Sequence, residues 1–378
     1  MLQRAARFRS SGVAIAAIRE LMACAGPSRV RLISVRFAAR ALAALLAALA
    51  AGAVSARAQD EQPFETEILA VRRVLPNVGP GLRGVCRGPG GNYYVLTAPG
   101  SAVAIYDPTG KRIGQVPAHP AGGAAIVYGE SMDVDSAGRI VVADRGAGGV
   151  KVYAPDGTLS AFIHMQSAES VAFLEGSEGS EVAVASASAA RLVTIYDTAG
   201  RPVREFGNSS DVTDQSEISA LSLPRQQENM GLIARDAASN VYFAFAYLPE
   251  PTVLKYDRLG YAQFDMIAKI PELAKPRPSE EQVYRNERAR VEGGGSLAPP
   301  RVVTAMGVDQ DNQDLWVSAG TLLVHFDKDG NHLASYRTYT SEGGRLEVTL
   351  ILVERDRLLL GADPFGLYEF TRPDKITH

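Results

Sequence analysis

Short apolar segments alternate with tight turns along most of this chain. From about residue 66 to residue 374, runs such as 139–144 (RIVVAD) and 241–245 (VYFAF) are separated by short stretches rich in Gly, Pro, Asp and Thr. Near-continuous apolar runs of about five residues are typical of strands that are covered on both faces. The pattern therefore predicts an all-β protein.

One phrase recurs in this pattern: a strand that ends in an aromatic residue, followed by a four-residue turn that closes on Gly. Its copies stand at 105–110, 152–157, 195–200, 255–260 and 325–330, with a degenerate sixth copy at 369–374. In the first copy, the Asp107 carboxylate can accept hydrogen bonds from the turn backbone, and Gly110 can adopt the positive φ that other residues resist. Each copy thus predicts a strand, a tight turn and a second strand.

Two further strands precede each copy, so the repeating unit has four antiparallel strands. In the second unit they are 131–135 and 139–144, joined by a turn. Six such units predict a six-bladed β-propeller. The last unit lacks its outer strand, and segment 66–75 belongs to no unit, so we expect this N-terminal strand to pair with 366–370 and close the last blade.

Two intervals between the recurrent aromatic residues are longer than the others. Three intervals are 43 to 47 residues, whereas two are 60 and 70, and the excess falls at about 207–228 and 269–300. Within the second stretch, 279–292 (SEEQVYRNERARVE) predicts a polar helix that begins at a Ser cap and stops at three glycines. We interpret both stretches as loop insertions in one propeller domain, residues 59–378.

The repeats resemble those of the NHL-repeat family of six-bladed propellers, over roughly residues 66 to 374. The second unit carries the resemblance most clearly, in Met132-Asp133-Val134-Asp135, Gly138-Arg139-Ile140-Val141-Val142-Ala143-Asp144, Val150-Lys151-Val152-Tyr153 and Asp156-Gly157. The resemblance implies the fold and no particular activity. The related gluconolactonase-like propellers hold a divalent cation with acids and an Asn, but no segment here reproduces their ligand motif.

The first 58 residues have the order of a secretory signal peptide. A long Arg-rich region precedes the apolar run 41–54 (ALAALLAALAAGAV), which is followed by Ala56-Arg57-Ala58. We expect cleavage after Ala58 and a mature protein that is secreted or periplasmic, with Met22 as an alternative start. An organelle transit peptide is the rival interpretation. Fourteen apolar residues are too few to span a bilayer, so no transmembrane span is predicted.

Charge and cysteine content exclude several classes of protein. The whole chain carries a formal charge of −3, but residues 1–58 contain nine Arg and one acid, so the remainder is strongly acidic and a poor binder of nucleic acid. Of the two cysteines, Cys24 lies in the leader and Cys86 in the body. The mature protein can therefore form no intramolecular disulfide, and Cys86 is interpreted as a small buried side chain.

Functional residues of a propeller are expected on the loops around one mouth of its central channel. Candidates are residues that begin an innermost strand or that follow the second strand of a blade. The binding residues predicted in this way are Arg83, Asp144, Arg145, Glu169, Asn229, Tyr247, Glu347 and Asp363. Glu130 and Glu250 stand at comparable positions.

No nucleophile elbow, phosphate-binding Gly loop or histidine metal motif occurs in the sequence, so no catalytic residue is predicted. We expect a monomeric, non-catalytic binding or scaffold module for a protein, peptide or glycan. No cofactor is predicted, although rim carboxylates could hold a divalent cation. The alternative is a hydrolase or lyase that uses a metal or carboxylates in the channel, and a third is an envelope subunit that docks through its 269–300 insertion.

Overall fold

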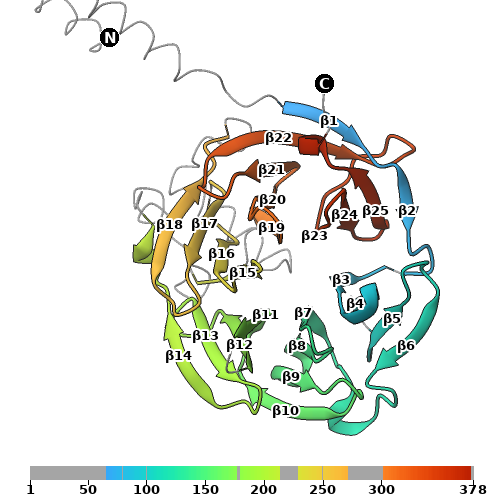
Figure 1. The fold of residues 1–378 in the computed structure, drawn as a ribbon, viewed down its shortest axis with the longest axis vertical. Helices are drawn as coiled ribbons and strands as arrows, with labels where there is room; N and C mark the ends of the chain where they lie inside the picture. The colour runs from blue at the N-terminus through green and yellow to red at the C-terminus, as the bar shows by residue number, and fades with distance from the viewer. Residues whose placement is uncertain are drawn as a thin grey trace, which may run out of the picture. The chain divides into compact units, whose positions relative to one another are not determined.

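Six separate sheets make up the described part of the chain, which comprises residues 65–78, 80–98, 100–176, 179–212, 229–248, 250–270 and 301–375. In this computed structural model the sheets belong to the unit Pro63–His378. Figure 1 shows them as a ring, each with its first strand nearest the centre. The predicted all-β, six-bladed β-propeller is confirmed.

Each blade is an antiparallel sheet whose first strand is innermost. The first blade contains β3 (Leu82–Arg87), β4 (Tyr93–Thr97), β5 (Val103–Tyr106) and β6 (Arg112–Val116). The second contains β7 (Gly129–Val134), β8 (Ile140–Asp144), β9 (Gly149–Tyr153) and β10 (Leu159–His164). The third contains β11 (Ala168–Gly176), β12 (Gly179–Ser186), β13 (Val193–Asp197) and β14 (Pro202–Phe206).

The other three blades repeat this order. The fourth contains β15 (Gly231–Arg235), β16 (Val241–Phe245), β17 (Thr252–Tyr256) and β18 (Ala262–Ile267). The fifth contains β19 (Val303–Val308), β20 (Leu315–Ala319), β21 (Leu322–Phe326) and β22 (His332–Tyr339). The sixth contains β23 (Leu350–Val353), β24 (Arg357–Ala362) and β25 (Gly366–Thr371).

The helices among the described residues are short 3-10 turns: η1 (Pro89–Gly91), η2 (Gly122–Ala124), η3 (Arg145–Ala147), η4 (Ser209–Asp211) and η5 (Pro373–Lys375). None of these is long and apolar enough to cross a membrane. The signal peptide predicted at 1–58 and the helix predicted at 279–292 lie outside the described residues, as does most of the 207–228 insertion.

The hydrophobic core lies between neighbouring blades. Buried apolar residues of the described chain form six clusters, and each cluster draws on two adjacent sheets. Trp316 of β20 and Phe370 of β25, for example, meet between the fifth and sixth blades. Because both faces of each sheet are covered, every residue of β8, β16 and β20 is buried, as the apolar runs predict.

The recurrent turn is held by its Asp carboxylate, as predicted. Asp107 Oδ1 accepts hydrogen bonds from the backbone N–H groups of Thr109 at 2.9 Å and Lys111 at 3.0 Å, and Gly110 has a φ of +88°. The same bonding recurs at Asp197, Asp257 and Asp327. The turn residues therefore fix the spacing of the two outer strands in these four blades.

The N-terminal segment joins two blades. β2 (Arg72–Val74) pairs antiparallel with β25 as the fourth strand of the sixth blade, which confirms the predicted closure. The prediction was wrong for the first half of the segment, because β1 (Glu65–Leu69) pairs in parallel with β22 of the fifth blade. The buried Ala70 lies between them, and its N–H donates to the carbonyl of Tyr339 at 2.9 Å. Figure 1 shows both strands on the outside of the ring.

A chain of ion pairs reinforces this closure. Arg87 of the first blade contacts Glu354 at 2.5 Å, and Glu354 also contacts Arg357 at 2.6 Å. Arg357 in turn contacts Glu369 at 2.7 Å, and Glu369 contacts Arg72 of β2 at 3.0 Å. The charged side chains thus connect the first blade, the last blade and the N-terminal strand.

Candidate functional site

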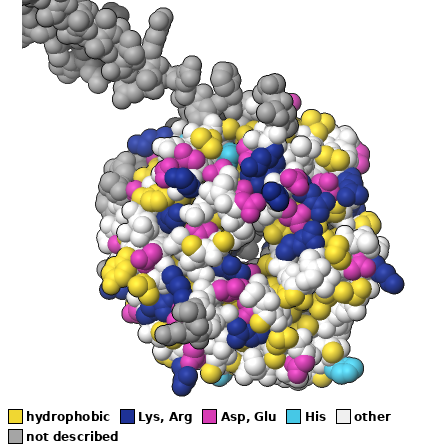
Figure 2. Space-filling view, in the orientation of Figure 1, with side chains coloured by type: hydrophobic (Ala, Val, Ile, Leu, Met, Phe, Trp, Pro, Cys, Tyr) yellow, Lys and Arg dark blue, Asp and Glu magenta, His cyan; other side chains and the backbone are white. Residues whose placement is uncertain are grey.

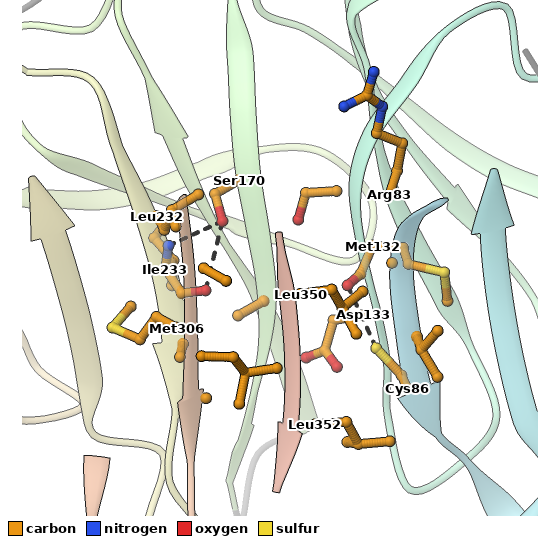
Figure 3. A pocket seen from close by; sticks show the side chains of 18 of the residues that line it. Arg83, Cys86, Met132, Asp133, Ser170, Leu232, Ile233, Met306, Leu350 and Leu352 are labelled. Atoms are coloured by element: carbon orange, nitrogen blue, oxygen red, sulfur yellow. Dashed lines mark hydrogen bonds between the residues drawn. The ribbon is translucent and has the colours of Figure 1, made fainter. Parts of the chain in front are cut away.

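The central channel of the ring forms a cavity of about 680 Å³, lined by all six innermost strands. Several hydroxyl groups in its wall tie neighbouring strands together. Ser170 Oγ accepts a hydrogen bond from the N–H of Ile233 at 2.9 Å, and Thr304 Oγ1 donates to the carbonyl of Val348 at 2.7 Å. The side chains left to contact a ligand in the middle of the cavity are largely apolar, such as Met306 and the leucines in Figure 3.

Charged side chains gather where the innermost strands begin. Because every blade starts at its inner strand, these beginnings share one end of the channel, which we call the channel mouth and define by Arg83, Tyr128, Glu130, Glu169 and Arg301. Figure 3 places Arg83 toward one end of the cavity and Leu352 toward the other. Figure 2 shows one face of the ring, on which acidic and basic side chains are interspersed around a central hollow.

The two glutamates of the mouth are held in ion pairs. Glu130 contacts Arg145 at 3.2 Å, and Glu169, which is 8% exposed, contacts Arg301 at 3.0 Å. Burial raises the pKa of Glu169 above its ordinary value of 4.5; Arg301 opposes this rise and Glu130 adds to it. For Arg301, burial lowers the pKa, but the Glu169 carboxylate and a hydrogen bond with Tyr247 raise it overall.

Arg83 contacts an aromatic residue instead of an acid. Its Nη2 donates to the hydroxyl of Tyr128 at 3.0 Å, and the guanidinium carbon is 5.8 Å from the centre of the Tyr128 ring. Its Nε is buried and has no hydrogen-bond partner among the residues that the structure describes. Arg83 therefore carries a positive charge at the mouth that nothing in the described residues neutralises.

Asp144 was predicted to line the mouth, but the structure places it beneath the surface. Its fully buried carboxylate accepts hydrogen bonds from the backbone N–H groups of Val127 (3.0 Å) and Tyr128 (2.8 Å) and from Lys151 Nζ (2.8 Å). Burial alone would raise the pKa of Asp144, but these hydrogen bonds lower it below 3.8. Asp144 therefore fixes the loop that carries Tyr128 and does not face the cavity.

The other predicted residues are placed as follows. Arg145, which is 63% exposed, reaches the mouth through Glu130, and the buried Tyr247 reaches it through Arg301. Asp363 is exposed and accepts a hydrogen bond from the Gly81 N–H at 3.0 Å. Asn229 is half-buried, and Glu347 is exposed. Of the eight predicted residues, Arg83 and Glu169 line the cavity.

Sequence reasoning missed Tyr128 and Arg301. Arg301 directly follows the 269–300 insertion and stands just before β19, and Arg83 is the second residue of β3, so both lie where an inner strand begins. Tyr128 is the aromatic residue directly before β7. Position relative to the inner strand was the signal that could have identified both.

Ion pairs link neighbouring blades at the end of the cavity away from the mouth. Arg235 contacts Asp133 at 3.4 Å and Glu175 at 3.8 Å, which links three neighbouring blades. Cys86 donates to the carbonyl of Met132 at 3.5 Å (Figure 3). Burial, together with the Asp133 carboxylate, raises the pKa of Cys86 well above 9.0, so the thiol stays protonated.

Among the described residues, one group of three has ligand atoms close enough to hold a metal ion: Asp314, His325 and Asp374, with atoms within 4.8 Å of one another. This group lies outside the cavity lining. The buried Arg372 donates to both carboxylate oxygens of Asp374, at 3.0 and 2.6 Å. The carboxylate is thus already engaged by a cation, and the group is part of the ion-pair network of the last blade.

Comparison with known proteins supports the fold. Neither a protein-family model nor a curated protein matches the chain. U3-55K has a TM-score of 0.50 at 9% identity, covering 82% of this chain and 100% of that chain. Virginiamycin B lyase from Staphylococcus aureus has a TM-score of 0.49 at 12% identity, covering 79% of this chain and 97% of that chain. Hydrazine synthase from Kuenenia stuttgartiensis has a TM-score of 0.47 at 11% identity, covering 83% of this chain and 99% of that chain.

The similarity to U3-55K concerns the fold alone and assigns no activity to this chain. Membership of the NHL-repeat family stays a prediction.

Proposed function

We propose that this chain is an exported binding propeller that receives part of a protein, peptide or glycan at the channel mouth. The observation that carries the proposal is a concave cavity of about 680 Å³ whose wall combines apolar side chains with polar groups, and whose rim consists of charged side chains. Sites of this kind orient a ligand with a few fixed polar groups and hold it by apolar contact.

The state of the mouth carboxylates favours binding over catalysis. Glu130 is paired with Arg145, and Glu169 is paired with Arg301. A general acid or base has to exchange a proton with its substrate, and pairing with a cation opposes protonation of a carboxylate. In the proposed function these pairs keep the rim in one shape before a ligand arrives.

A hydrolase or lyase is the second candidate, and one observation favours it. Burial raises the pKa of Glu169, and Glu130 lies close enough to raise it further. A carboxyl group with a raised pKa can serve as a general acid. In this alternative Glu169 would donate the proton, alone or beside a divalent cation held by the rim carboxylates.

An array of peptides and glycans probed with the mature protein separates these functions. The wild type should bind the retained ligands, and the Arg301→Gln variant should not. The Glu347→Gln variant, a control at an exposed residue outside the cavity, should bind them like the wild type. Each retained ligand is then incubated with the protein, and the mass of the ligand is measured by mass spectrometry before and after. An unchanged mass supports a binding module, whereas conversion that is lost in Glu169→Gln supports the enzyme. Retention that Arg301→Gln leaves unaffected would reject the mouth as the site.

The Glu169→Gln variant should fold, with a free energy of unfolding at neutral pH within about 1 kcal/mol of the wild type, because the lost ion pair and the relieved burial of charge offset each other. As the pH falls from the raised folded-state pKa toward 4.5, the wild type should gain stability relative to the variant, since the folded protein binds the proton more readily. Urea unfolding at several pH values measures this difference.

A chelator gives the companion test of the cation alternative. A metal-free mouth predicts the same melting temperature with and without the chelator for wild type and Glu169→Gln alike. A wild type that melts lower in chelator, beside an insensitive variant, would show a cation bound at Glu169 and support the enzyme.

Export is tested by the mass of the mature protein. The basic region, the apolar run and Ala56-Arg57-Ala58 lead us to expect a chain that begins at Gln59 outside the cytoplasm. Intact-mass measurement of the exported protein should find residues 1–58 removed, and their retention would contradict the signal-peptide interpretation.

A further inference from the structure

Arg83 differs from every other charged residue of the cavity. Six of the seven charged residues in the lining form an ion pair within the described part of the chain: Arg87, Glu130, Asp133, Glu169, Arg235 and Arg301. Arg83 forms none there. A guanidinium keeps its proton at physiological pH, so a full positive charge stands in a concave site without a counter-ion from the part of the chain that the structure describes.

The guanidinium of Arg83 is nonetheless held in place. Its hydrogen bond with Tyr128 is the single one that it makes among the described residues, and its Nε donates to no acceptor. Tyr128 is itself held by Asp144 through its backbone N–H. An arginine that is ordered before a ligand binds loses little conformational entropy on binding.

The charges around Arg83 favour a ligand with a single negative charge. The mouth contains two arginines, Arg83 and Arg301, and two glutamates, and the glutamates are satisfied by Arg301 and Arg145. One positive charge is left over, which a monoanion neutralises. A doubly charged phosphate would leave an excess negative charge beside Glu130 and Glu169, and like charges in a partly buried site repel one another.

Apolar surface adjoins this charge. Tyr128 lines the cavity, is 36% exposed, and has its ring centre 5.8 Å from the guanidinium carbon of Arg83. An exposed aromatic ring beside this arginine suits a ligand whose carboxylate is attached to an apolar or aromatic group.

We propose that Arg83 is the anchor for a carboxylate ligand of this type, which enters the channel mouth with its carboxylate on the guanidinium and its apolar part against the ring of Tyr128. This inference rests on the proposed binding function and names the class of ligand. The planar guanidinium can present two parallel N–H groups to the two oxygens of a carboxylate, which gives orientation as well as affinity.

The test uses N-acetyl-L-phenylalanine and its neutral amide as probes, with the mature protein labelled with [15N]arginine. In the wild type, the acid should shift the Nε–H signal of Arg83 and bind with a dissociation constant in the millimolar range, at least about tenfold tighter than the amide. Arg83→Gln should weaken binding of the acid at least about tenfold. Arg83→Lys keeps the positive charge but lacks the two parallel N–H groups of the guanidinium, so it should weaken binding less than Arg83→Gln does.

The control is Arg112→Gln, at an exposed arginine on β6, the outermost strand of the first blade, which should bind like the wild type. Melting temperatures establish that each variant is folded. If Arg83→Gln does not fold, Arg83→Lys tests whether binding depends on Arg83. Equal affinity for acid and amide, equal affinity of wild type and both Arg83 variants, or tighter binding of inorganic phosphate than of the acid would overturn the inference.

The two proposals fail in different ways. If ligands on the array depend on Arg301 but show no preference for a carboxylate and no dependence on Arg83, the ligand class is wrong and the binding function stands. If neither arginine affects any retained ligand, the binding function itself fails.

Discussion

Deletion of residues 59–75 is expected to cost about 5 kcal/mol or more of the free energy of unfolding, which is comparable with the whole stability of many domains. The deletion removes β1 and β2, exposes the edges of β22 and β25, and takes Leu75 and Ala70 out of the core. Burial of a leucine side chain alone stabilises by about 2 kcal/mol. Urea unfolding should show a cooperative loss, and size-exclusion chromatography should show association through the exposed edges.

Two controls distinguish the contribution of the two strands to stability from that of the Arg72–Glu369 ion pair. A chain that begins at Glu65 keeps both strands and should unfold like the mature protein. Arg72→Ala should cost less than about 1 kcal/mol, because the arginine of the Arg72–Glu369 pair is 64% exposed. An unchanged unfolding curve for the 59–75 deletion would show that the ring closes without its N-terminal strands.

Asp144→Asn is expected to be the most damaging single substitution near the site, at about 3–5 kcal/mol. It leaves the buried Lys151 ammonium without a carboxylate and weakens the hydrogen bonds to the loop that carries Tyr128. Because hydrogen bonds lower the pKa of Asp144 in the folded protein, its contribution is complete above pH 3.8 and is lost as the pH falls toward the lower folded-state pKa. Chemical unfolding of wild type and variant between pH 7 and pH 3 measures both effects.

The double variant Asp144→Asn, Lys151→Met is the matched control. Removing both charges should restore part of the stability lost in Asp144→Asn, since an apolar side chain replaces the unpaired ammonium. A double variant as unstable as Asp144→Asn would show that the loss comes from the loop hydrogen bonds and not from the buried charge.

Local chemistry made the fold predictable from the sequence. The Asp and Gly of each recurrent turn act within four residues of one another, so Asp107 and Gly110 make the contacts that their spacing predicts. The closure of the last blade was also predictable, because a missing outer strand leaves an edge that some segment has to cover. The parallel pairing of β1 was not, since nothing in residues 65–69 distinguishes one exposed edge from another.

The candidate site was less predictable, because its most buried ion pair, Glu169–Arg301, forms between blades that are far apart in the sequence. Arg301 and Glu169 are 132 residues apart, and their contact depends on how the inner strands of three blades are placed around the channel. Asp144 illustrates a missed signal. Lys151 lies in an otherwise apolar strand, GVKVY, and a lysine in such a strand needs a buried acid, which Asp144 supplies.

The central claim is that ligands bind at the channel mouth, and a titration calorimetry series tests it most directly. The dissociation constant of one ligand retained on the array is measured for the wild type, Arg301→Gln and Glu347→Gln. Our account predicts at least about tenfold weaker binding for Arg301→Gln, through loss of its pair with Glu169, and an unchanged constant for Glu347→Gln. An Arg301→Gln protein that is folded and binds as tightly as the wild type would contradict it.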